Sequence, residues 1–425
     1  MSNQHDGSET AARRSNRRTF LQTASTAAGL AAAAPAFSVL GQEARGANDR
    51  IGVGFIGTGG RCQAHMKIVG DLQKAGKAER VAVCDIYGPR LRKAAELTGG
   101  TPYRNYQELL ADPKVDAVCI ATPDRHHAPQ AIDAVRAGKD VYVEKPLVHW
   151  SQFSLARKLA EEAERHGRIV QVGTQYVADD AYVDIRRRIE EGVVGKIVHV
   201  QTGFFRRGDW GERMPIPDPQ AQPGKDLDWK QFLGDAPEVP FSVSRFFQWR
   251  LYWDYAGGPA TDLLVHAFTP VFCLLDLDFP ERVLGGGGNF QYDREVPDQC
   301  NIIADYPGGP SVVMTNSLSN FTGIDTMLRG TDGIIIWKGV GHKENKGARI
   351  VPAAKGAKEI FIPWRGMGQT SRLWENFIDC IHSRKKPYSP VDLAVRVQAP
   401  LNMGILSHRE SRVARFDTAA EKIVI

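Results

Sequence analysis

The sequence predicts two domains, an N-terminal doubly wound α/β domain with a parallel sheet and a C-terminal α+β domain with a mainly antiparallel sheet. Three observations support this fold class. Short β-branched runs alternate with helical stretches from Ile51 to about Gly173. A glycine-rich turn directly follows the first run. Beyond Gly173 several strand-like runs cluster together, and 425 residues are enough for two cores.

The first domain is expected to alternate strands and helices along the chain. Each strand is a short apolar run, and Gly138 marks the end of one helix. The expected strands cover 51–56, 80–84, 117–120, 140–143 and 169–172. The expected helices cover 60–73, 89–98, 127–137 and 151–166.

The second domain has a different pattern. A helix is expected over 181–191 and a strand over 196–202. A long segment, 206–254, follows and is rich in Pro, Asp and Trp. We expect it to be a loop that is functional or covers the domain. Further strands are expected at 282–284, 301–306, 311–316, 326–329 and 333–337. Helices are expected at 261–275, 369–383 and 391–409, the last able to pack back on the first domain. The glycine run 285–288 reads as a loop.

The first residues have the features of a twin-arginine export signal. Arg17 and Arg18 stand in the run Asn-Arg-Arg-Thr-Phe-Leu-Gln, followed by an alanine-rich stretch and a small-residue cleavage site that ends at Ala36. The apolar stretch is shorter than the roughly 20 residues of a transmembrane helix. We therefore expect a signal peptide (1–36), a linker (37–50), a dinucleotide-binding domain (51–173) and a substrate-binding or oligomerisation domain (174–425), in a periplasmic protein that is not an integral membrane protein.

Composition argues against several other classes. The formal net charge of +5 would fall to +3 without the leader, and no basic run with interleaved aromatic residues indicates nucleic-acid binding. The six cysteines show neither C-x-x-C pairs nor histidines at zinc spacing, so neither a metal site nor a disulfide framework is expected.

A cofactor site is predicted where the first strand ends. A glycine-rich turn that opens into a helix lets backbone N–H groups approach a pyrophosphate. Asp85 closes the next strand, where a carboxylate accepts hydrogen bonds from the adenosine ribose and disfavours a 2′-phosphate, so NAD is expected rather than NADP. The motif departs from the usual glycine or alanine at its third position. The residues assigned to the turn are Gly57, Gly59, Gly60, Arg61 and Cys62.

Two further blocks identify a family. The runs 121–128 (Ala-Thr-Pro-Asp-Arg-His-His-Ala) and 137–146 (Ala-Gly-Lys-Asp-Val-Tyr-Val-Glu-Lys-Pro) closely resemble the Gfo/Idh/MocA oxidoreductases, and the resemblance extends from Ile51 onward. It implies that Lys145 lies beside the nicotinamide and the reacting sugar hydroxyl, and that the peptide before Pro146 is commonly cis. Glu144, also expected near the cofactor, would orient Lys145 or pair with it. It also assigns cofactor contacts to Thr122, Pro123, His127 and Gln175.

The block 257–266 completes the predicted catalytic set. Asp262 and His266 are spaced i, i+4, which places both side chains on one face of a helix, about 6 Å apart at Cβ. By resemblance, His266 acts as acid/base or substrate ligand and Asp262 as its partner, while burial beside a cationic ring would lower the pKa of Lys145 so that it can take a hydroxyl proton.

For the substrate, the long segment offers arginines and flat aromatic rings suited to a sugar, namely Arg206, Trp249, Tyr252 and Trp253. The same residues would equally suit a covered domain interface. We expect hydride transfer between a carbohydrate or polyol alcohol and tightly bound NAD, in a homo-oligomer. An NAD-dependent glycoside hydrolase, related by resemblance to the α-N-acetylgalactosaminidases, and a non-catalytic sugar-binding protein are the alternatives.

Overall fold

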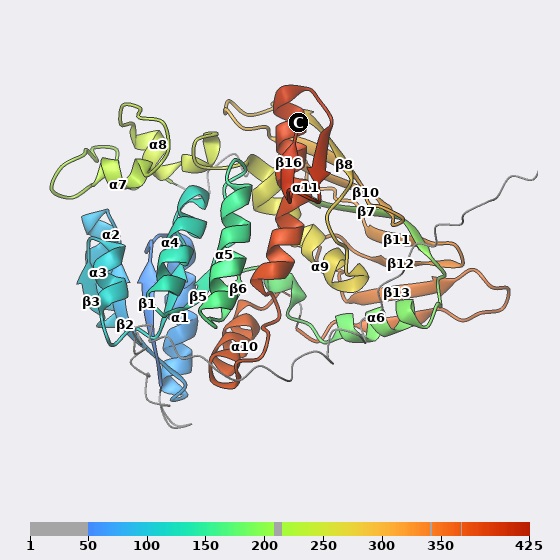
Figure 1. The fold of residues 1–425 in the computed structure, drawn as a ribbon, viewed down its shortest axis with the longest axis horizontal. Helices are drawn as coiled ribbons and strands as arrows, with labels where there is room; N and C mark the ends of the chain where they lie inside the picture. Colours follow the sequence, from blue (N-terminus) through green and yellow to red (C-terminus); the bar gives the residue numbers. More distant parts are fainter. Residues whose placement is uncertain (1–49, 208–214, 341, 367) are drawn as a thin grey trace, which may run out of the picture. The chain divides into compact units, whose positions relative to one another are not determined.

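The computed structural model describes residues 50–207, 215–340, 342–366 and 368–425 (Figure 1). The predicted leader, with Arg17 and Arg18, lies outside the described residues. So does Trp210. Within the described ranges, no helix is both long and apolar enough to cross a membrane.

The first domain is built on a six-stranded parallel sheet with the order β3-β2-β1-β4-β5-β6, and the predicted fold class is confirmed (Figure 1). Its strands are β1 (Ile51–Ile56), β2 (Ala78–Cys84), β3 (Thr101–Tyr103), β4 (Ala117–Ile120), β5 (Asp140–Val143) and β6 (Val170–Val172). The sequence did not predict β3, because three residues at a sheet edge carry too little periodicity.

Helices cover both faces of this sheet. One face packs against α1, α2 and α10, and the other against α3, α4 and α5. Their bounds are α1 (Gly60–Lys74), α2 (Gly88–Thr98), α3 (Tyr106–Ala111), α4 (Asp124–Arg136), α5 (Phe153–Arg165) and α10 (Thr370–Ser383). The helix α10 comes late in the chain, yet its Trp374 is fully buried and stacks on Tyr142 of β5 with ring centroids 4.6 Å apart. A segment from beyond residue 173 therefore completes the core of the first domain.

The second domain contains a ten-stranded sheet with the order β14-β13-β12-β11-β7-β10-β9-β8-β15-β16, in which only the neighbours β7 and β10 run parallel. The strands are β7 (Ile197–Phe205), β8 (Arg282–Gly288), β9 (Gln299–Asp305), β10 (Ser311–Ser317), β11 (Thr326–Gly330), β12 (Gly333–Trp337), β13 (Gly347–Pro352), β14 (Ile360–Pro363), β15 (Ala414–Asp417) and β16 (Lys422–Val424). The short strands β13 to β16 were not predicted.

The prediction that residues 285–288 form a loop is wrong, because they are the second half of β8 and pair with β9. Packing explains the glycines. A Cβ on Gly285 would lie 1.8 Å from the carbonyl oxygen of Gly404, in α11 (Val391–Glu410), and a Cβ on Gly404 would lie 2.5 Å from Ile302 of β9. Only glycine lets the helix backbone approach the sheet this closely.

Three helices cover the inner face of the ten-stranded sheet: α6 (Ala181–Glu190), α9 (Val265–Leu275) and α11. The predicted helix 261–275 is continuous but irregular, because Ala260–Leu264 forms a π-helical turn before α9. Such turns are rare and are frequent at functional sites. The segment predicted as a long loop contains α7 (Trp229–Leu233), α8 (Val243–Phe247) and a 3₁₀ turn, Trp249–Leu251.

Candidate active site

The glycine turn lies at the carboxyl end of β1, where ligands bind in open α/β sheets. Gly57 has φ +81°, and a Cβ there would lie 2.6 Å from Cγ2 of Thr122, so the position requires glycine. A Cβ on Gly59 or Gly60 would instead meet nothing within 4 Å. The first turn of α1 has no acidic residue, and Gly59 caps it without a side-chain hydrogen bond. The open space beside these two glycines leaves room for a pyrophosphate at the start of α1.

Asp85 holds this turn from the next strand. One carboxylate oxygen accepts hydrogen bonds from the backbone N–H and the hydroxyl of Thr58, at 2.8 and 3.0 Å, and the other accepts from the backbone N–H of Tyr87 at 2.8 Å. A carboxylate retains further lone pairs for ribose hydroxyls. Its negative charge at this point opposes a 2′-phosphate, which favours NAD over NADP.

Lys145 and Asp262 form a buried ion pair. The Nζ of Lys145 donates to Oδ1 of Asp262 at 2.5 Å and to its backbone oxygen at 2.8 Å. The two side chains are only 10% and 13% exposed. Nε of Arg250 lies 3.6 Å from the same Oδ1, so one carboxylate is shared by two cations. Burial lowers the pKa of Lys145, a shift that Asp262 opposes and Arg250 reinforces.

His266 lies in the same cluster, one turn further along the helix. Its ring contacts Tyr176 edge-on, with centroids 5.3 Å apart. Burial holds its pKa well below the usual value, and the positive charge of Lys145 adds to the shift. Within the described part of the chain, its Nδ1 is buried and has no hydrogen-bond partner. Asp262 was expected to be the partner of His266, but its carboxylate contacts Lys145 and Arg250. The imidazole of His266 is therefore available to a ligand.

Asp124 is a site residue that the sequence analysis did not single out. It is the first residue of α4 and only 3% exposed, and its electrostatic neighbours are Arg250, Asp262 and Lys145. Burial raises the pKa of Asp124 to about 7, although Arg250 and Lys145 act in the opposite direction. Its place directly after Pro123, inside the block that contains Thr122 and His127, is a sequence signal that identifies it.

A chain of buried hydrogen bonds supports the residue before Lys145. The indole N–H of Trp374 donates to Nδ1 of His65 at 2.9 Å, so the proton of a neutral ring stands on Nε2 and is donated to Glu144 at 2.8 Å. Glu144 also accepts from Nε of Arg61 at 2.8 Å. Burial alone would raise the pKa of Glu144, but Arg61 and His65 more than offset it, so the carboxyl is ionised. The chain fixes Arg61 beside the glycine turn.

His127 joins two turns of the site. Its Nδ1 lies 2.6 Å from the carbonyl oxygen of Pro146 and its Nε2 lies 2.8 Å from that of Thr122. Burial lowers the pKa of His127 to about 4, so the ring is neutral and donates to one of these oxygens. The peptide between Lys145 and Pro146 is cis. Gln175 begins a short 3₁₀ turn, and its Oε1 is buried without a partner among the described residues.

The predicted substrate residues fall into two groups. Arg206 interacts with Tyr176, and Trp249 stacks against the guanidinium of Arg250 at 4.1 Å, so both belong to the surroundings of the ion pair. Tyr252 instead donates to Ser244. Trp253 packs at 5.6 Å from Trp150, so the described contacts of these two side chains serve packing. Cys62, assigned to the glycine motif, is fully buried in the core.

The residues present fit a dinucleotide. Open space faces the glycine turn, and two buried polar atoms, Nδ1 of His266 and Oε1 of Gln175, are left for a ligand. Within the described ranges, no group of three or more His, Cys, Asp or Glu side chains is arranged to hold a metal ion.

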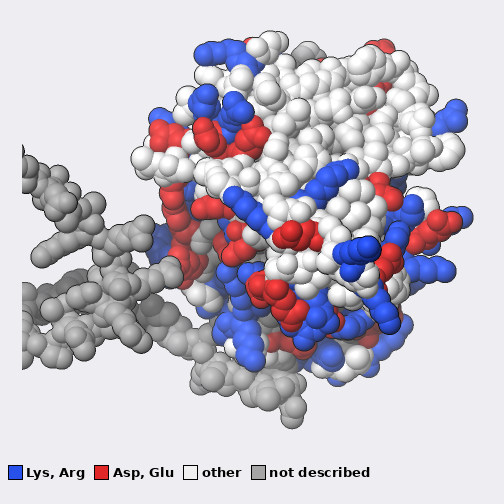
Figure 2. Space-filling model, turned by 90° about the vertical axis from the view of Figure 1, so that its right-hand side faces the viewer, with Lys and Arg blue, Asp and Glu red and all other residues white. Residues whose placement is uncertain are grey.

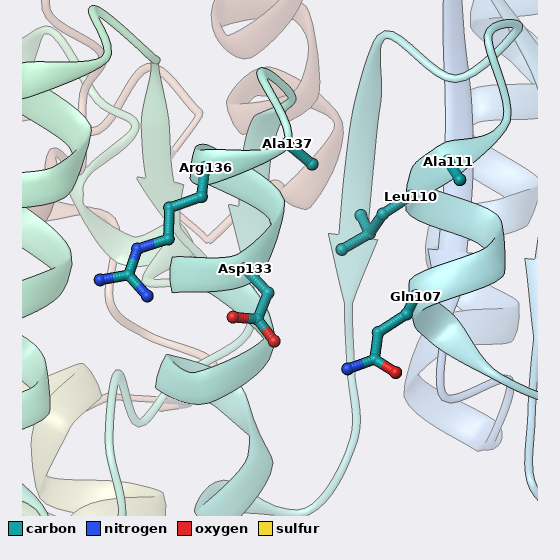
Figure 3. A pocket seen from close by; sticks show the side chains of 6 residues that line it. All are labelled: Gln107, Leu110, Ala111, Asp133, Arg136 and Ala137. Carbon is teal, nitrogen blue, oxygen red and sulfur yellow. The ribbon is translucent and has the colours of Figure 1, made fainter.

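A shallow depression of about 340 Å³ between α3 and α4 is separate from this cluster (Figure 3). It is at the carboxyl end of α4, whereas Asp124 and His127 are at the amino end of this 13-residue helix, roughly 20 Å long. The depression is lined by Gln107, Leu110, Ala111, Asp133, Arg136 and Ala137.

A parallel sheet with a glycine turn and Asp85, followed by an α/β domain that supplies Asp262 and His266, defines a dinucleotide-dependent oxidoreductase architecture. Two family models match the chain, "Oxidoreductase family, NAD-binding Rossmann fold" over residues 51–174 and "Oxidoreductase family, C-terminal alpha/beta domain" over residues 179–425. The protein belongs to the Gfo/Idh/MocA oxidoreductase family, and its first domain is the NAD-binding domain of that family.

Several characterised relatives are similar over part of the chain. An inositol 2-dehydrogenase of Rubrobacter xylanophilus is 34% identical over 166 residues, which are 39% of this chain and 46% of the relative. A scyllo-inositol 2-dehydrogenase (NAD(+)) of Bacillus subtilis is 38% identical over 143 residues, 34% of this chain and 37% of the relative. The chain thus matches about half or less of the length of these two relatives.

Solved structures share the fold. A levoglucosan dehydrogenase in complex with NADH has a TM-score of 0.65 at 18% identity, covering 86% of this chain and 98% of that one. The WlbA dehydrogenase of Bordetella pertussis, in complex with NADH and UDP-GlcNAcA, has a TM-score of 0.63 at 18% identity, covering 87% and 99%. Identities this low establish the common fold alone.

Proposed function

We propose that this protein is an exported oxidoreductase that transfers a hydride between a secondary alcohol of a carbohydrate or polyol and tightly bound NAD(H). The observation that carries the proposal is the buried Lys145–Asp262 pair near Nδ1 of His266, which has no hydrogen-bond partner among the described residues. Lys145 follows β5 and the glycine turn follows β1, so both lie at the carboxyl edge of the parallel sheet. The nicotinamide, when bound, supplies the hydride acceptor or donor.

Each residue of the cluster has a proposed task. Lys145, once it has lost the proton that it holds in the ion pair with Asp262, takes the hydroxyl proton while a hydride leaves the carbon that bears this hydroxyl. The carbon becomes that of a ketone, and charge is conserved. Asp262 orients Lys145 and stabilises the ammonium that forms, because its Oδ1 lies 2.5 Å from Nζ. His266 hydrogen-bonds a second substrate hydroxyl through Nδ1. Arg250 opposes protonation of Lys145 and therefore keeps it a competent base.

The substrate class is supported by the cluster and by the relatives. Arg250, stacked on Trp249, offers donors beside an aromatic face, an arrangement suited to hydroxyl-rich rings. Relatives that bear the names inositol dehydrogenase and levoglucosan dehydrogenase share the family or the fold. A cyclic polyol or a sugar is therefore the class to screen.

The test is spectroscopic. Purified protein carrying NAD⁺ is mixed with myo-inositol, glucose or levoglucosan, and the absorbance of the reduced nicotinamide is followed. We expect one member of this class to reduce the cofactor and Lys145→Ala to abolish the reaction while nucleotide binding persists. Full activity of Lys145→Ala, or an absence of response across the class, contradicts the proposal.

A second candidate function is favoured by Asp124. A glycosidase that uses NAD transiently needs an additional acid or base for elimination of the aglycone, and a buried carboxyl with a pKa of about 7 next to Lys145 meets that need. Free sugar released from an aryl glycoside without net change of the nicotinamide absorbance would favour this candidate. A ketone product with reduced cofactor would favour the dehydrogenase.

Export by the twin-arginine machinery is supported by Arg17 and Arg18 ahead of the alanine-rich stretch. This route would carry the folded protein into the periplasm with its cofactor in place. Fractionation of cells that express the full chain should find it in the periplasm, and the double variant R17K/R18K should remain in the cytoplasm. Equal export of both contradicts the assignment.

We also propose a homo-oligomer that packs through the outer face of the ten-stranded sheet. Cross-strand pairs place Leu284, Ile303 and Val313 in one outward row that continues through Gln201 to Met327. Leu284 and Ile303 are 47% and 43% exposed. Figure 2, which views the right-hand side of Figure 1, shows a broad region without charged side chains in its upper half. Light scattering should give a mass above that of one chain, and Ile303→Lys should lower it.

A further inference from the structure

Residues 215–256, called the strap below, form a small layer of their own. The strap contains α7 and α8 and has an aromatic core in which Phe232, Phe246 and Tyr255 pack together, with ring centroids of Phe232 about 5.0 Å from each of the other two. Figure 1 shows α7 and α8 beyond the ends of α2 and α4, on the side where the strands of the parallel sheet end.

The first anchor joins the strap to the loop after β2. The backbone N–H of Gly88 donates to the carbonyl oxygen of Asp226 at 2.7 Å, and the hydroxyl of Tyr87 donates to Asp218 at 2.8 Å. The ring of Tyr87 also contacts Phe246 edge-on at 5.6 Å and belongs to the strap's core. The residue two positions after Asp85 is therefore shared between the two layers.

The second anchor is at the first turn of α4. Nε of Arg125 donates to the carbonyl oxygen of Asp254 at 2.5 Å, and its Nη1 lies 3.2 Å from Oδ1 of Asp235. Nε2 of His126 lies 2.7 Å from the carbonyl oxygen of Phe232, to which it donates. Arg125 is 9% exposed, so these contacts are largely shielded from water.

The third anchor is at the loop between β5 and α5. The carbonyl oxygen of Trp253 accepts from the indole of Trp150 at 2.9 Å and from Nε2 of His149 at 2.8 Å. The guanidinium of Arg409, at the end of α11, lies 4.6 Å from the ring of Trp150 and 4.7 Å from that of Trp253. This anchor holds the strap from both domains.

The order of the strands shows which loops of the parallel sheet the three anchors connect. In the sequence of neighbours β2-β1-β4-β5, the anchors hold the loops after β2, β4 and β5 and leave out β1, which lies between the first two. The glycine turn follows β1, so the strap is anchored on both sides of it. The strap does not fill the space there, because a Cβ on Gly59 or Gly60 would meet nothing within 4 Å. Asp85, at the adenosine end, is only 6% exposed.

We propose that the strap closes over the adenosine and pyrophosphate half of NAD and makes it a resident cofactor that stays bound between turnovers. The inference rests on the proposed function in that NAD(H) is the ligand. Release then requires at least one anchor to open, and the anchors are intact hydrogen bonds and aromatic contacts in the structure. A cofactor held in this way must be regenerated in place.

The test measures release of NADH from the full chain. Protein loaded with NADH is mixed with excess NAD⁺, and the decay of the bound NADH fluorescence gives the dissociation rate. Tyr87→Phe removes the hydroxyl of the first anchor, and Asp235→Ala removes an exposed carboxylate of the second. Each should raise the rate up to about five-fold, since a hydrogen bond contributes roughly 1 kcal/mol. Tyr106→Phe is the matched control, because its hydroxyl bonds Asp133 at 2.7 Å outside the strap.

A second readout is independent of fluorescence. Loading with NADH should slow proteolytic cleavage within residues 215–256 of the wild type, and less so in the two anchor variants. Unchanged dissociation rates and protection in both variants would overturn the strap inference while NADH binding and the proposed function stand. A chain that binds no NADH would overturn the proposed function itself.

Discussion

The buried pair of Lys145 and Asp262 makes the replacement Asp262→Asn informative. The substitution keeps the shape of the side chain and removes the negative charge that contacts both Lys145 and Arg250. Breaking a buried ion pair by neutralising one partner costs about 3–5 kcal/mol. Because both side chains are nearly buried, we expect a loss of this size in the free energy of unfolding near pH 7.

The sign of the pH dependence follows from the pKa of Lys145, which is lowered on folding. A base with a lowered pKa binds fewer protons in the folded than in the unfolded chain, so stability rises with pH between the folded pKa and the unfolded value of 10.5. Without Asp262, the pKa of Lys145 in the folded chain falls further, so the pH range over which stability rises extends to lower pH. The stability deficit of Asp262→Asn should therefore narrow as the pH rises toward the folded pKa of Lys145 in the wild type, and stay constant above it.

Urea unfolding at several pH values measures this directly. Asp392→Asn provides the control, because Asp392 pairs with Lys386 at 2.7 Å but the two side chains are 45% and 68% exposed. An exposed pair contributes at most about 1 kcal/mol. If Asp262→Asn were destabilised no more than Asp392→Asn and kept the pH slope of the wild type, the ion-pair reasoning would be refuted.

Three further results are expected. Gly57→Ala should lower the free energy of unfolding by about 1–3 kcal/mol, because Gly57 has a positive φ and Thr122 lies close to it. Gly59→Ala should keep a free energy of unfolding within about 0.5 kcal/mol of wild type, but bind NADH more weakly in a fluorescence titration. Trp374→Phe leaves Nδ1 of the buried His65 without its hydrogen-bond donor and should lower the free energy of unfolding in urea by about 1–3 kcal/mol. An unchanged free energy of unfolding would show that this chain of hydrogen bonds does not stabilise the protein. The pKa of Asp124 is raised by folding from 3.8 to about 7, so its contribution to stability falls as the pH rises through that interval. Asp124→Asn should therefore gain in stability relative to wild type between about pH 4 and pH 7, and parallel stability curves over that range would contradict this.

The sequence predicted those parts of the site whose residues are close together along the chain. The glycine turn, Asp85 after the second strand and the Asp262/His266 pair each follow from local patterns. Contacts between distant segments were beyond such patterns. Asp262 meets Lys145 across 117 residues, and Trp374 meets His65 across 309. A single sequence carries no periodicity that reports such pairings.

The misjudged elements have related causes. The glycine run 285–288 has the composition of a loop, but it pairs with β9 as part of a strand. Its Gly285 is required because the backbone of α11 packs directly against β8. The long segment after Arg206 has loop composition as well, yet its aromatic residues form a core that includes Tyr87 of the first domain. Arg125 donates a further hydrogen bond to the backbone of this segment. In both cases tertiary packing overrides local propensity.

The central claim is that a substrate carbon exchanges a hydride with NAD held over the glycine turn, with Lys145 taking the proton. The most direct measurement is mass spectrometry of the nicotinamide recovered from protein incubated with carbon-deuterated myo-inositol, glucose or levoglucosan. The account predicts deuterium on the nicotinamide for one of these compounds with the wild type and none with Lys145→Ala. A substrate that is converted without any deuterium reaching the cofactor would contradict it.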